Sequence, residues 1–124
     1  MILAFKERFK QPILDGKKAH SIREDKHDRW KEGKIIHFST GVRTKHYNCF
    51  MLCTCKHIQE IEIGIRRIER GLYESAIKVD GRVLSEDEAV LLAKKDGFDN
   101  LFDFFDYFKK SFKGKIIHWT NFKY

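Results

Sequence analysis

A long β-prone stretch runs from Asn48 to about Arg67, and within it Ile61, Ile63 and Ile65 alternate with polar residues and Gly64. Alternation with a period of two is typical of a strand that buries one face. The stretch is long enough to bend through two strands or to contain a break. Both interpretations favour a fold built on a largely antiparallel sheet.

Shorter β-prone segments lie on both sides of this stretch. They predict strands at Met1 to Phe5, Ala19 to Arg23, Lys34 to Thr40, Tyr73 to Val79 and Lys115 to Phe122. The pair Asp80-Gly81 is a strong hairpin-turn signal. Between Lys6 and Asp15 the apolar residues have helical spacing, and Gly16 is a plausible stop. A short helix is therefore expected after the first strand.

Two further helices are predicted before the last strand. Ser85 and Glu88 form a capping-box pattern ahead of the run Ala89 to Lys95, and Asp96-Gly97 ends that run. Asp99 is expected to cap the second helix. The apolar face of that helix is predicted to consist of Leu101, Phe104, Phe105, Phe108 and Phe112.

This order of elements predicts an α+β fold in a single domain spanning residues 1–124. About six strands with helices covering one side suggest a small, mixed and partly open β-barrel. One helix follows the first strand of this arrangement, and two helices precede the last strand.

Positive charge is concentrated in the first part of the chain. Of a net charge of +7, residues 1–72 hold 16 Lys/Arg against 9 Asp/Glu, and residues 73–124 hold 9 of each. Such asymmetry favours an anionic partner, most simply nucleic acid or a nucleotide.

The three cysteines, Cys49, Cys53 and Cys55, do not suggest a disulfide framework, because their number is odd. On a strand they would share a face with His57, and Cys53 and His57 would lie about 13 Å apart, too far for one zinc ion. A buried strand face is the favoured interpretation, and neither a metal nor a cofactor is expected.

No apolar run approaches the roughly 18 residues of a membrane span. The segment Met1 to Lys6 has neither a basic start nor a small-residue cleavage site, so it does not resemble a signal peptide. The expectation is a cytoplasmic protein without a membrane partner.

Side chains that can bind anions or act as a nucleophile are concentrated between Ile13 and Asp25. After the stop at Gly16 come the cations Lys17 and Lys18, then the hydroxyl of Ser21 and the guanidinium of Arg23. Donors and one nucleophile placed so closely after a helix are typical of a small anion- or nucleotide-handling pocket. The alternative is a solvated basic turn followed by an ordinary edge strand.

These residues also resemble a known family. The motifs are Phe5-Lys6-Glu7-Arg8-Phe9, Ile13-Leu14-Asp15-Gly16-Lys17-Lys18 with Ser21-Ile22-Arg23, Trp30-Lys31-Glu32-Gly33-Lys34-Ile35-Ile36-His37-Phe38, and Asp96-Gly97-Phe98 followed by Leu101 and Phe104. On these motifs the chain resembles the ASCH family of the PUA-like superfamily of small β-barrels. Small bacterial members of that family are similar to acetylcytidine amidohydrolase.

The resemblance implies a metal-independent amidohydrolase that removes an acyl group from the exocyclic amine of a modified cytidine nucleoside. By the motif, Lys18 is the base, Ser21 is the nucleophile and Asp96 assists. Lys18 and Ser21 have opposite parity, so they can meet only if Lys18 lies in the turn before the strand, or if a bulge intervenes.

Two other functions remain open at this stage. One is a non-catalytic RNA-binding module that uses Lys17, Arg23, Arg29, Arg43 and Lys45 together with Lys18. The other is a ribonuclease that uses the same basic pocket. Trp30, in the polar loop, is a candidate for stacking a base or for packing. The partner is thus a modified nucleoside or RNA, and protein partners are unknown from the sequence.

Overall fold

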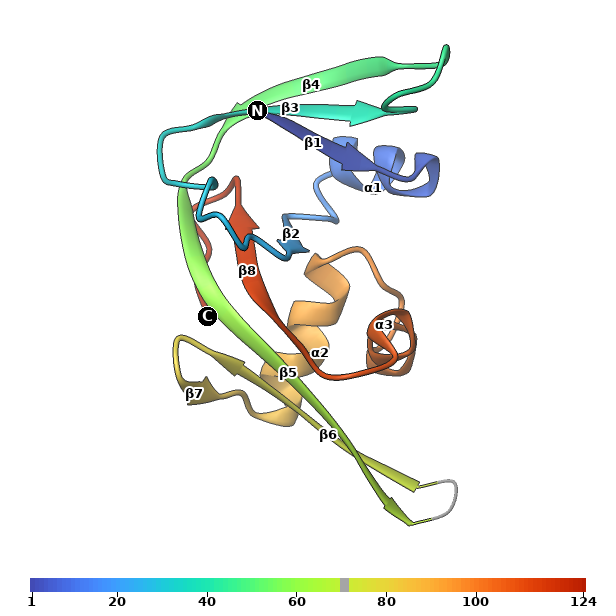
Figure 1. Ribbon diagram of the computed structural model, residues 1–124, viewed down its shortest axis with the longest axis vertical. Helices are drawn as coiled ribbons and strands as arrows, with labels where there is room; N and C mark the ends of the chain where they lie inside the picture. Colours follow the sequence, from blue (N-terminus) through green and yellow to red (C-terminus); the bar gives the residue numbers. More distant parts are fainter. Residues whose placement is uncertain (70–71) are drawn as a thin grey trace.

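The computed structural model describes residues 1–69 and 72–124 (Figure 1). Its elements, in chain order, are β1 (Ile2–Phe5), the 3-10 helix η1 (Glu7–Phe9), α1 (Lys10–Leu14), β2 (His20–Arg23), β3 (Ile35–Thr40), β4 (Asn48–Thr54), β5 (His57–Glu69), β6 (Leu72–Val79), β7 (Arg82–Val83), α2 (Glu86–Lys95), α3 (Leu101–Phe108) and β8 (Phe112–His118). No helix in these described residues is long and apolar enough to cross a membrane.

The strands form two sheets. A three-stranded sheet has the order β1-β3-β4, in which β1 and β3 are parallel and β3 and β4 antiparallel. A five-stranded sheet has the order β2-β8-β5-β6-β7 and is antiparallel throughout. The fold is therefore a mixed α+β fold, and its described strands do not close into one barrel.

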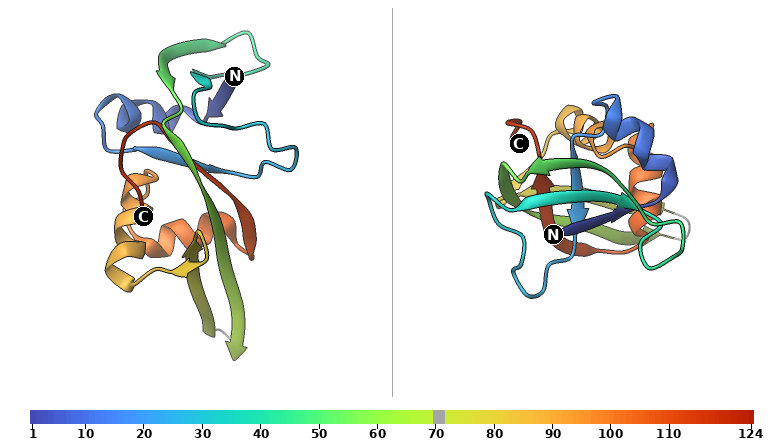
Figure 2. Two further views of the ribbon diagram at one scale, coloured as in Figure 1. Left: turned by 90° about the vertical axis from the view of Figure 1, so that its left-hand side faces the viewer. Right: turned by 90° about the horizontal axis from the view of Figure 1, so that it is seen from above.

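The long β-prone stretch contains a break. Strand β4 ends at Thr54, β5 begins at His57, and the two strands belong to different sheets. Cys55 is fully buried at this break, and its main-chain N–H donates to the carbonyl of Lys34. The chain thus bends from one sheet into the other, as Figures 1 and 2 show. The stretch forms two strands, with the break between Thr54 and His57.

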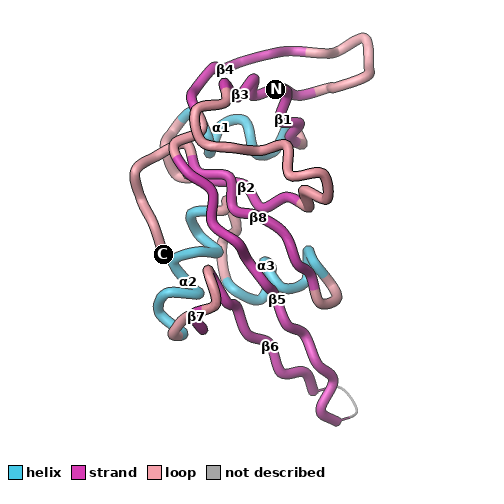
Figure 3. The backbone as a smooth tube through the Cα atoms, turned by 60° about the vertical axis from the view of Figure 1, so that its left-hand side comes forward, coloured by secondary structure: helices cyan, strands magenta, loops and turns pink. Residues whose placement is uncertain are grey.

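Helices α2 and α3 cover one face of the five-stranded sheet (Figure 2). Ile61 and Ile63, which alternate on β5, are buried beneath these helices with Leu92 and Phe104. Farther along, β5 and β6 run past the helices toward one end of the molecule (Figure 3). A second apolar cluster joins side chains of the three-stranded sheet, among them Phe38, to Ile13 of α1 and Ile117 of β8.

The capping box at Ser85 is confirmed: its side chain accepts from the main-chain N–H of Glu88, and the Glu88 carboxylate accepts from the N–H of Ser85. The predicted turn at Asp80-Gly81 is also confirmed, since both residues have positive φ angles and join β6 to β7.

The prediction that Asp99 caps the next helix is wrong. Asn100 is the cap, because its backbone is extended and its side-chain oxygen accepts from the N–H of Asp103 at 2.8 Å. The predicted apolar face is also too long. Lys109, with a φ of +63°, ends the helix, and Phe112 begins β8 three residues before the predicted strand start.

Candidate active site

Main-chain hydrogen bonds hold the turn before β2 against α1 on one side and against the end of α2 on the other. The carbonyl of Pro12 in α1 accepts from the N–H groups of Lys17 and Lys18, at 2.9 and 3.0 Å. The N–H of Ala19 then donates to the carbonyl of Lys95 at 2.7 Å. Because β2 begins at His20, Lys18 lies in the turn, the first of the two arrangements that its parity with Ser21 allows.

Lys18 and Asp96 meet at this junction. The Lys18 ammonium nitrogen lies 2.5 Å from the main-chain oxygen of Asp96 and 3.4 Å from its carboxylate oxygen Oδ1. Only 3% of Lys18 and 4% of Asp96 is exposed. Burial lowers the pKa of Lys18 and Arg23 lowers it further, while the Asp96 carboxylate opposes both effects. The site thus holds an amine that loses its proton more readily than an exposed lysine does.

Aromatic rings surround the two cations of the site. Lys18 Nζ lies 4.9 Å from the centre of the Phe9 ring and 5.8 Å from that of Phe5. The Arg23 guanidinium lies 5.0 Å from the centre of the Phe5 ring. The ring faces attract both positive charges, and Lys18 is in addition buried.

Gly97 allows this close packing. Its φ is +98°, a conformation that L side chains rarely adopt. A Cβ atom at this position would lie 3.1 Å from Phe9 Cδ1 and 3.2 Å from Lys18 Cδ. Glycine therefore permits both the backbone turn after Asp96 and the contact with Lys18.

Ser21 is held by Arg23, two residues later on the same face of β2. The Ser21 hydroxyl oxygen accepts from Arg23 Nε at 2.9 Å, and Arg23 Nη2 donates to the carbonyl of Ala4 at 2.5 Å. Ser21 is 4% exposed. Its oxygen thus faces a fixed positive charge, and among the described residues no acceptor of its proton lies within hydrogen-bond distance.

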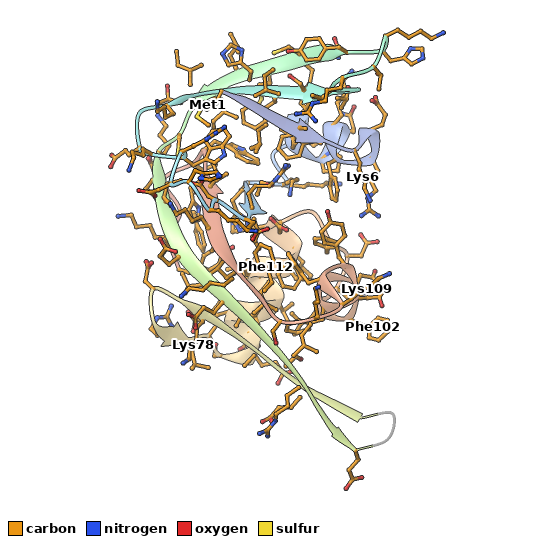
Figure 4. The ribbon with its side chains drawn as sticks, viewed as in Figure 1. Met1, Lys6, Lys78, Phe102, Lys109 and Phe112 are labelled. Carbon is orange, nitrogen blue, oxygen red and sulfur yellow. The ribbon has the colours of Figure 1, made fainter. Side chains whose placement is uncertain are left out.

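A cavity of about 450 Å³ joins these groups. Lys18, Ser21, Arg23 and Asp96 all line it, and its other walls include Phe5, Phe9, Phe98 and Tyr107. Lys6 also lines it, and Figure 4 shows Lys6 at the end of β1, on the same side of the molecule as Lys109 at the end of α3. This volume is in the usual range for small-molecule sites.

The other basic residues singled out from the sequence lie outside the cavity. Lys17 and Arg29 are exposed and do not line it. Arg43 and Lys45 are exposed on the loop between β3 and β4. That loop begins at Gly41 and Val42, which do line the cavity, so its two cations lie close in sequence to the cavity wall.

Trp30 is not available for stacking a base. It is only 8% exposed and belongs to the same apolar cluster as Leu3 and Ile36. Its main-chain N–H donates to the carboxylate of Asp25 at 2.9 Å. The loop therefore turns the indole into the core, which favours the packing alternative.

Sequence reasoning missed the residues that line the cavity from distant parts of the chain. Tyr107, in α3, carries no local signal that distinguishes it from the other aromatic residues there. Phe98 belongs to the motif Asp96-Gly97-Phe98, but the motif alone does not place it in a cavity wall. The strand pattern favours a barrel-lining or exposed position for His20. This residue is fully buried, which excludes the exposed alternative, and its ring contacts the carboxylate of Asp96.

The described part of the chain contains no group of three or more His, Cys, Asp or Glu side chains that could hold a metal ion. Comparisons with protein-family models, with curated proteins and with solved structures each return no match. The family resemblance therefore rests on the sequence motifs alone.

Proposed function

We propose that the chain is an amidohydrolase that removes an acyl group from the exocyclic amine of a modified cytidine nucleoside. One observation carries the proposal: Lys18 is buried against Asp96, and its pKa is lowered, in a cavity that also contains the Ser21 hydroxyl. A base, a nucleophile and a carboxylate in one small cavity are the groups that acyl transfer requires.

In the first step, the Ser21 oxygen attacks the acyl carbon and the neutral amine of Lys18 takes the serine proton. The C–N bond then breaks, and Lys18 returns the proton to the leaving amine of cytosine. Water next attacks the acyl-serine ester, again with Lys18 as base, and releases the carboxylic acid and free Ser21. The products are cytidine and acetate when the acyl group is acetyl.

Arg23 and Asp96 have supporting roles in this scheme. The Arg23 Nε–H that already contacts the Ser21 oxygen stabilises the negative charge that develops there as the proton leaves. Asp96 orients the Lys18 amine through its main-chain and side-chain oxygens. The aromatic walls provide flat apolar surfaces for a pyrimidine ring.

Incubation of the protein with N4-acetylcytidine, followed by chromatography, tests the proposal. Release of cytidine is expected from wild type, and neither Lys18→Met nor Ser21→Ala should release it. The matched controls are Lys17→Met, the exposed neighbour of Lys18, and Ser75→Ala, an exposed serine on β6. Both controls should retain wild-type turnover.

Two results would count against the proposal. The first is no release by a wild-type protein whose circular dichroism shows that it is folded. The second is a Ser21→Ala variant as active as wild type.

A second candidate function is RNA binding. It is favoured by the exposed Arg43 and Lys45 on the loop that begins in the cavity wall. Because phosphate contacts release counterions, affinity for a short single-stranded RNA should fall steeply with salt, and the double variant Arg43→Gln/Lys45→Gln should reduce that dependence. Absent or salt-independent binding would remove this candidate.

The finer fold assignment is also a proposal. We infer a partly open PUA-like barrel, and its support is that β4 and β5 carry the chain from one sheet directly into the other. A cytoplasmic location is proposed as well. It is supported by three free cysteines, of which Cys49 is exposed, since free thiols are typical of reducing compartments.

A further inference from the structure

A hydrogen-bonded chain continues behind the cavity from Asp96. The carboxylate oxygen Oδ1 that lies near Lys18 also lies 3.1 Å from Nδ1 of His20. The other ring nitrogen of His20, Nε2, lies 2.5 Å from the hydroxyl oxygen of Tyr124. His20 is fully buried and does not line the cavity. Four side chains from three distant parts of the sequence thus form one chain: Lys18, Asp96, His20 and Tyr124.

The positions of the protons in this chain follow from the chemistry of its members. A carboxylate only accepts, so His20 Nδ1 must carry a hydrogen and donate it to Asp96. Burial lowers the pKa of His20, which keeps its ring neutral. The unprotonated Nε2 then accepts from the Tyr124 hydroxyl. Asp96 Oδ1 consequently faces two donors, one on the cavity side and one behind it.

The far end of the chain is anchored. Gln59, on β5, accepts from the N–H of Tyr124 at 3.1 Å and donates to its carbonyl at 3.1 Å. The ring of His118 packs against that of His20, with 5.2 Å between centres. The titratable and charged groups that face the His20 ring are Lys18, Lys95, Asp96, His118 and Tyr124. Tyr124 is therefore held by Gln59 of β5, and the His20 ring is held by its packing against His118.

We propose that His20 and Tyr124 are positioning residues, which hold the Asp96 carboxylate from behind and thereby set how strongly Lys18 binds its proton. Without the His20 donor, the carboxylate is free to move toward Lys18 and pairs with it alone. Lys18 then keeps its proton to higher pH and is a poorer base at neutral pH. The consequence for turnover rests on the proposed function, whereas the effect on Lys18 does not.

Three variants separate the contacts. His20→Leu removes the donor to Asp96. His20→Asn keeps a donor where Nδ1 stood and loses the contact with Tyr124. Tyr124→Phe removes only the hydroxyl. Tyr107→Phe is the matched control, because Tyr107 lines the cavity but contacts neither His20 nor Asp96 through its hydroxyl in the described hydrogen bonds.

The first measurement needs no substrate. The pKa of Lys18 is followed by carbon-13 NMR of its Cε atom during a pH titration. In His20→Leu it should rise by about one pH unit relative to wild type, since a hydrogen bond to a charged group is worth about a factor of ten or more. It should stay near the wild-type value in His20→Asn and Tyr107→Phe, and rise less in Tyr124→Phe. An unchanged Lys18 pKa in a folded His20→Leu protein would overturn the proposal.

A second measurement uses wild type alone, so the proposal remains testable if the His20 variants do not fold. Long-range proton–nitrogen NMR spectra report which ring nitrogen of a histidine is protonated. A neutral His20 ring with hydrogen on Nδ1 is expected at pH 7. A ring protonated on Nε2, or a charged ring, would contradict the proposed chain.

The kinetic measurement distinguishes this inference from the function on which it rests. If wild type releases cytidine, His20→Leu should lower kcat about tenfold at pH 7 with KM changed less than twofold, and the acidic limb of its pH profile should move upward. Equal kcat values in wild type and folded His20→Leu would overturn the positioning role. If wild type releases none, the proposed function fails, and the two NMR measurements still decide whether His20 controls Lys18.

Discussion

The ammonium nitrogen of Lys18 lies 2.5 Å from the main-chain oxygen of Asp96, 78 residues later in the sequence. The contact is buried, and the Phe9 ring and the Gly97 backbone surround it. A lysine so enclosed is destabilised in its charged form, while the neighbouring carboxylate and carbonyl partly compensate. The balance between these effects determines both the chemistry of the site and its stability.

The activity of the protein should rise with pH as Lys18 loses its proton. Its pKa is lowered from 10.5, chiefly by burial, and the base must be neutral to accept the serine proton. The acidic limb of kcat/KM for acetylcytidine should therefore lie below pH 10.5, with activity lost as pH falls through the pKa of Lys18. A profile that falls with rising pH across this range would contradict Lys18 as base.

Gly97→Ala should destabilise the fold more than a matched glycine variant does. Gly97 combines a φ of +98° with close contacts to Phe9 and Lys18, whereas Gly81 has a φ of +82° and no neighbouring atom within 4 Å of where a Cβ would lie. Both variants introduce backbone strain of about 1 kcal/mol, and Gly97→Ala adds crowding of about 1–3 kcal/mol. Urea unfolding of Gly97→Ala and Gly81→Ala measures the free energy of unfolding of each. Equal losses in the two variants would show that the contact with Lys18 is not tight.

Acid should destabilise the protein through its buried histidines. Burial lowers the pKa of His118 to about 3, and the nearby His20 and His57 rings lower it too. Below pH 6.5 the unfolded chain protonates this histidine and the folded protein does not, so stability falls as pH falls toward 3. At pH 5 the loss is about 2 kcal/mol for His118.

Urea unfolding at pH 7.5 and pH 5 measures this loss. His118→Gln keeps a donor to Gln59. It should reduce the slope of the free energy of unfolding against pH by the equivalent of about one bound proton. The exposed His27 is the control, and His27→Gln should leave the dependence unchanged. The same dependence in wild type and His118→Gln would show that His118 is not the residue that carries it.

Helix α3 should depend on Asn100 and not on Asp99. Asn100→Ala removes the side-chain oxygen that accepts from the N–H of Asp103, which is worth about 1 kcal/mol at a helix N-terminus. Asp99→Ala leaves that bond in place and should change the free energy of unfolding by less than about 0.5 kcal/mol. A larger loss from Asp99→Ala would restore the prediction made from the sequence.

Local features were readable from the sequence because each depends on residues close along the chain. The Ser85 capping box involves two residues three positions apart, the Asp80-Gly81 turn needs only two positive φ angles, and the alternation of Ile61 and Ile63 reports a buried face. The concentration of Lys18, Ser21 and Arg23 was visible for the same reason. One cavity does join them.

Tertiary packing decided what the sequence left open or assigned wrongly. The break between Thr54 and His57 depends on which sheet each half joins, and the burial of Trp30 depends on how its loop folds back over the core. Neither of these is a local property.

Packing likewise decided which residues come together in the candidate site. Its motif names Lys18 and Asp96, but tertiary contacts bring the turn and the helix end together: the main-chain bond from Ala19 to Lys95 and the bonds from Lys18 to Asp96. Tyr124 carried no signal, and the strand pattern at His20 did not indicate its contact with Asp96. Periodicity and capping act within one or two turns of the chain, whereas the protonation of a buried lysine depends on every charge and dipole around it. The charged groups that act on Lys18, among them Arg8, Arg23 and Asp96, come from separate segments, and only the folded chain places them near it.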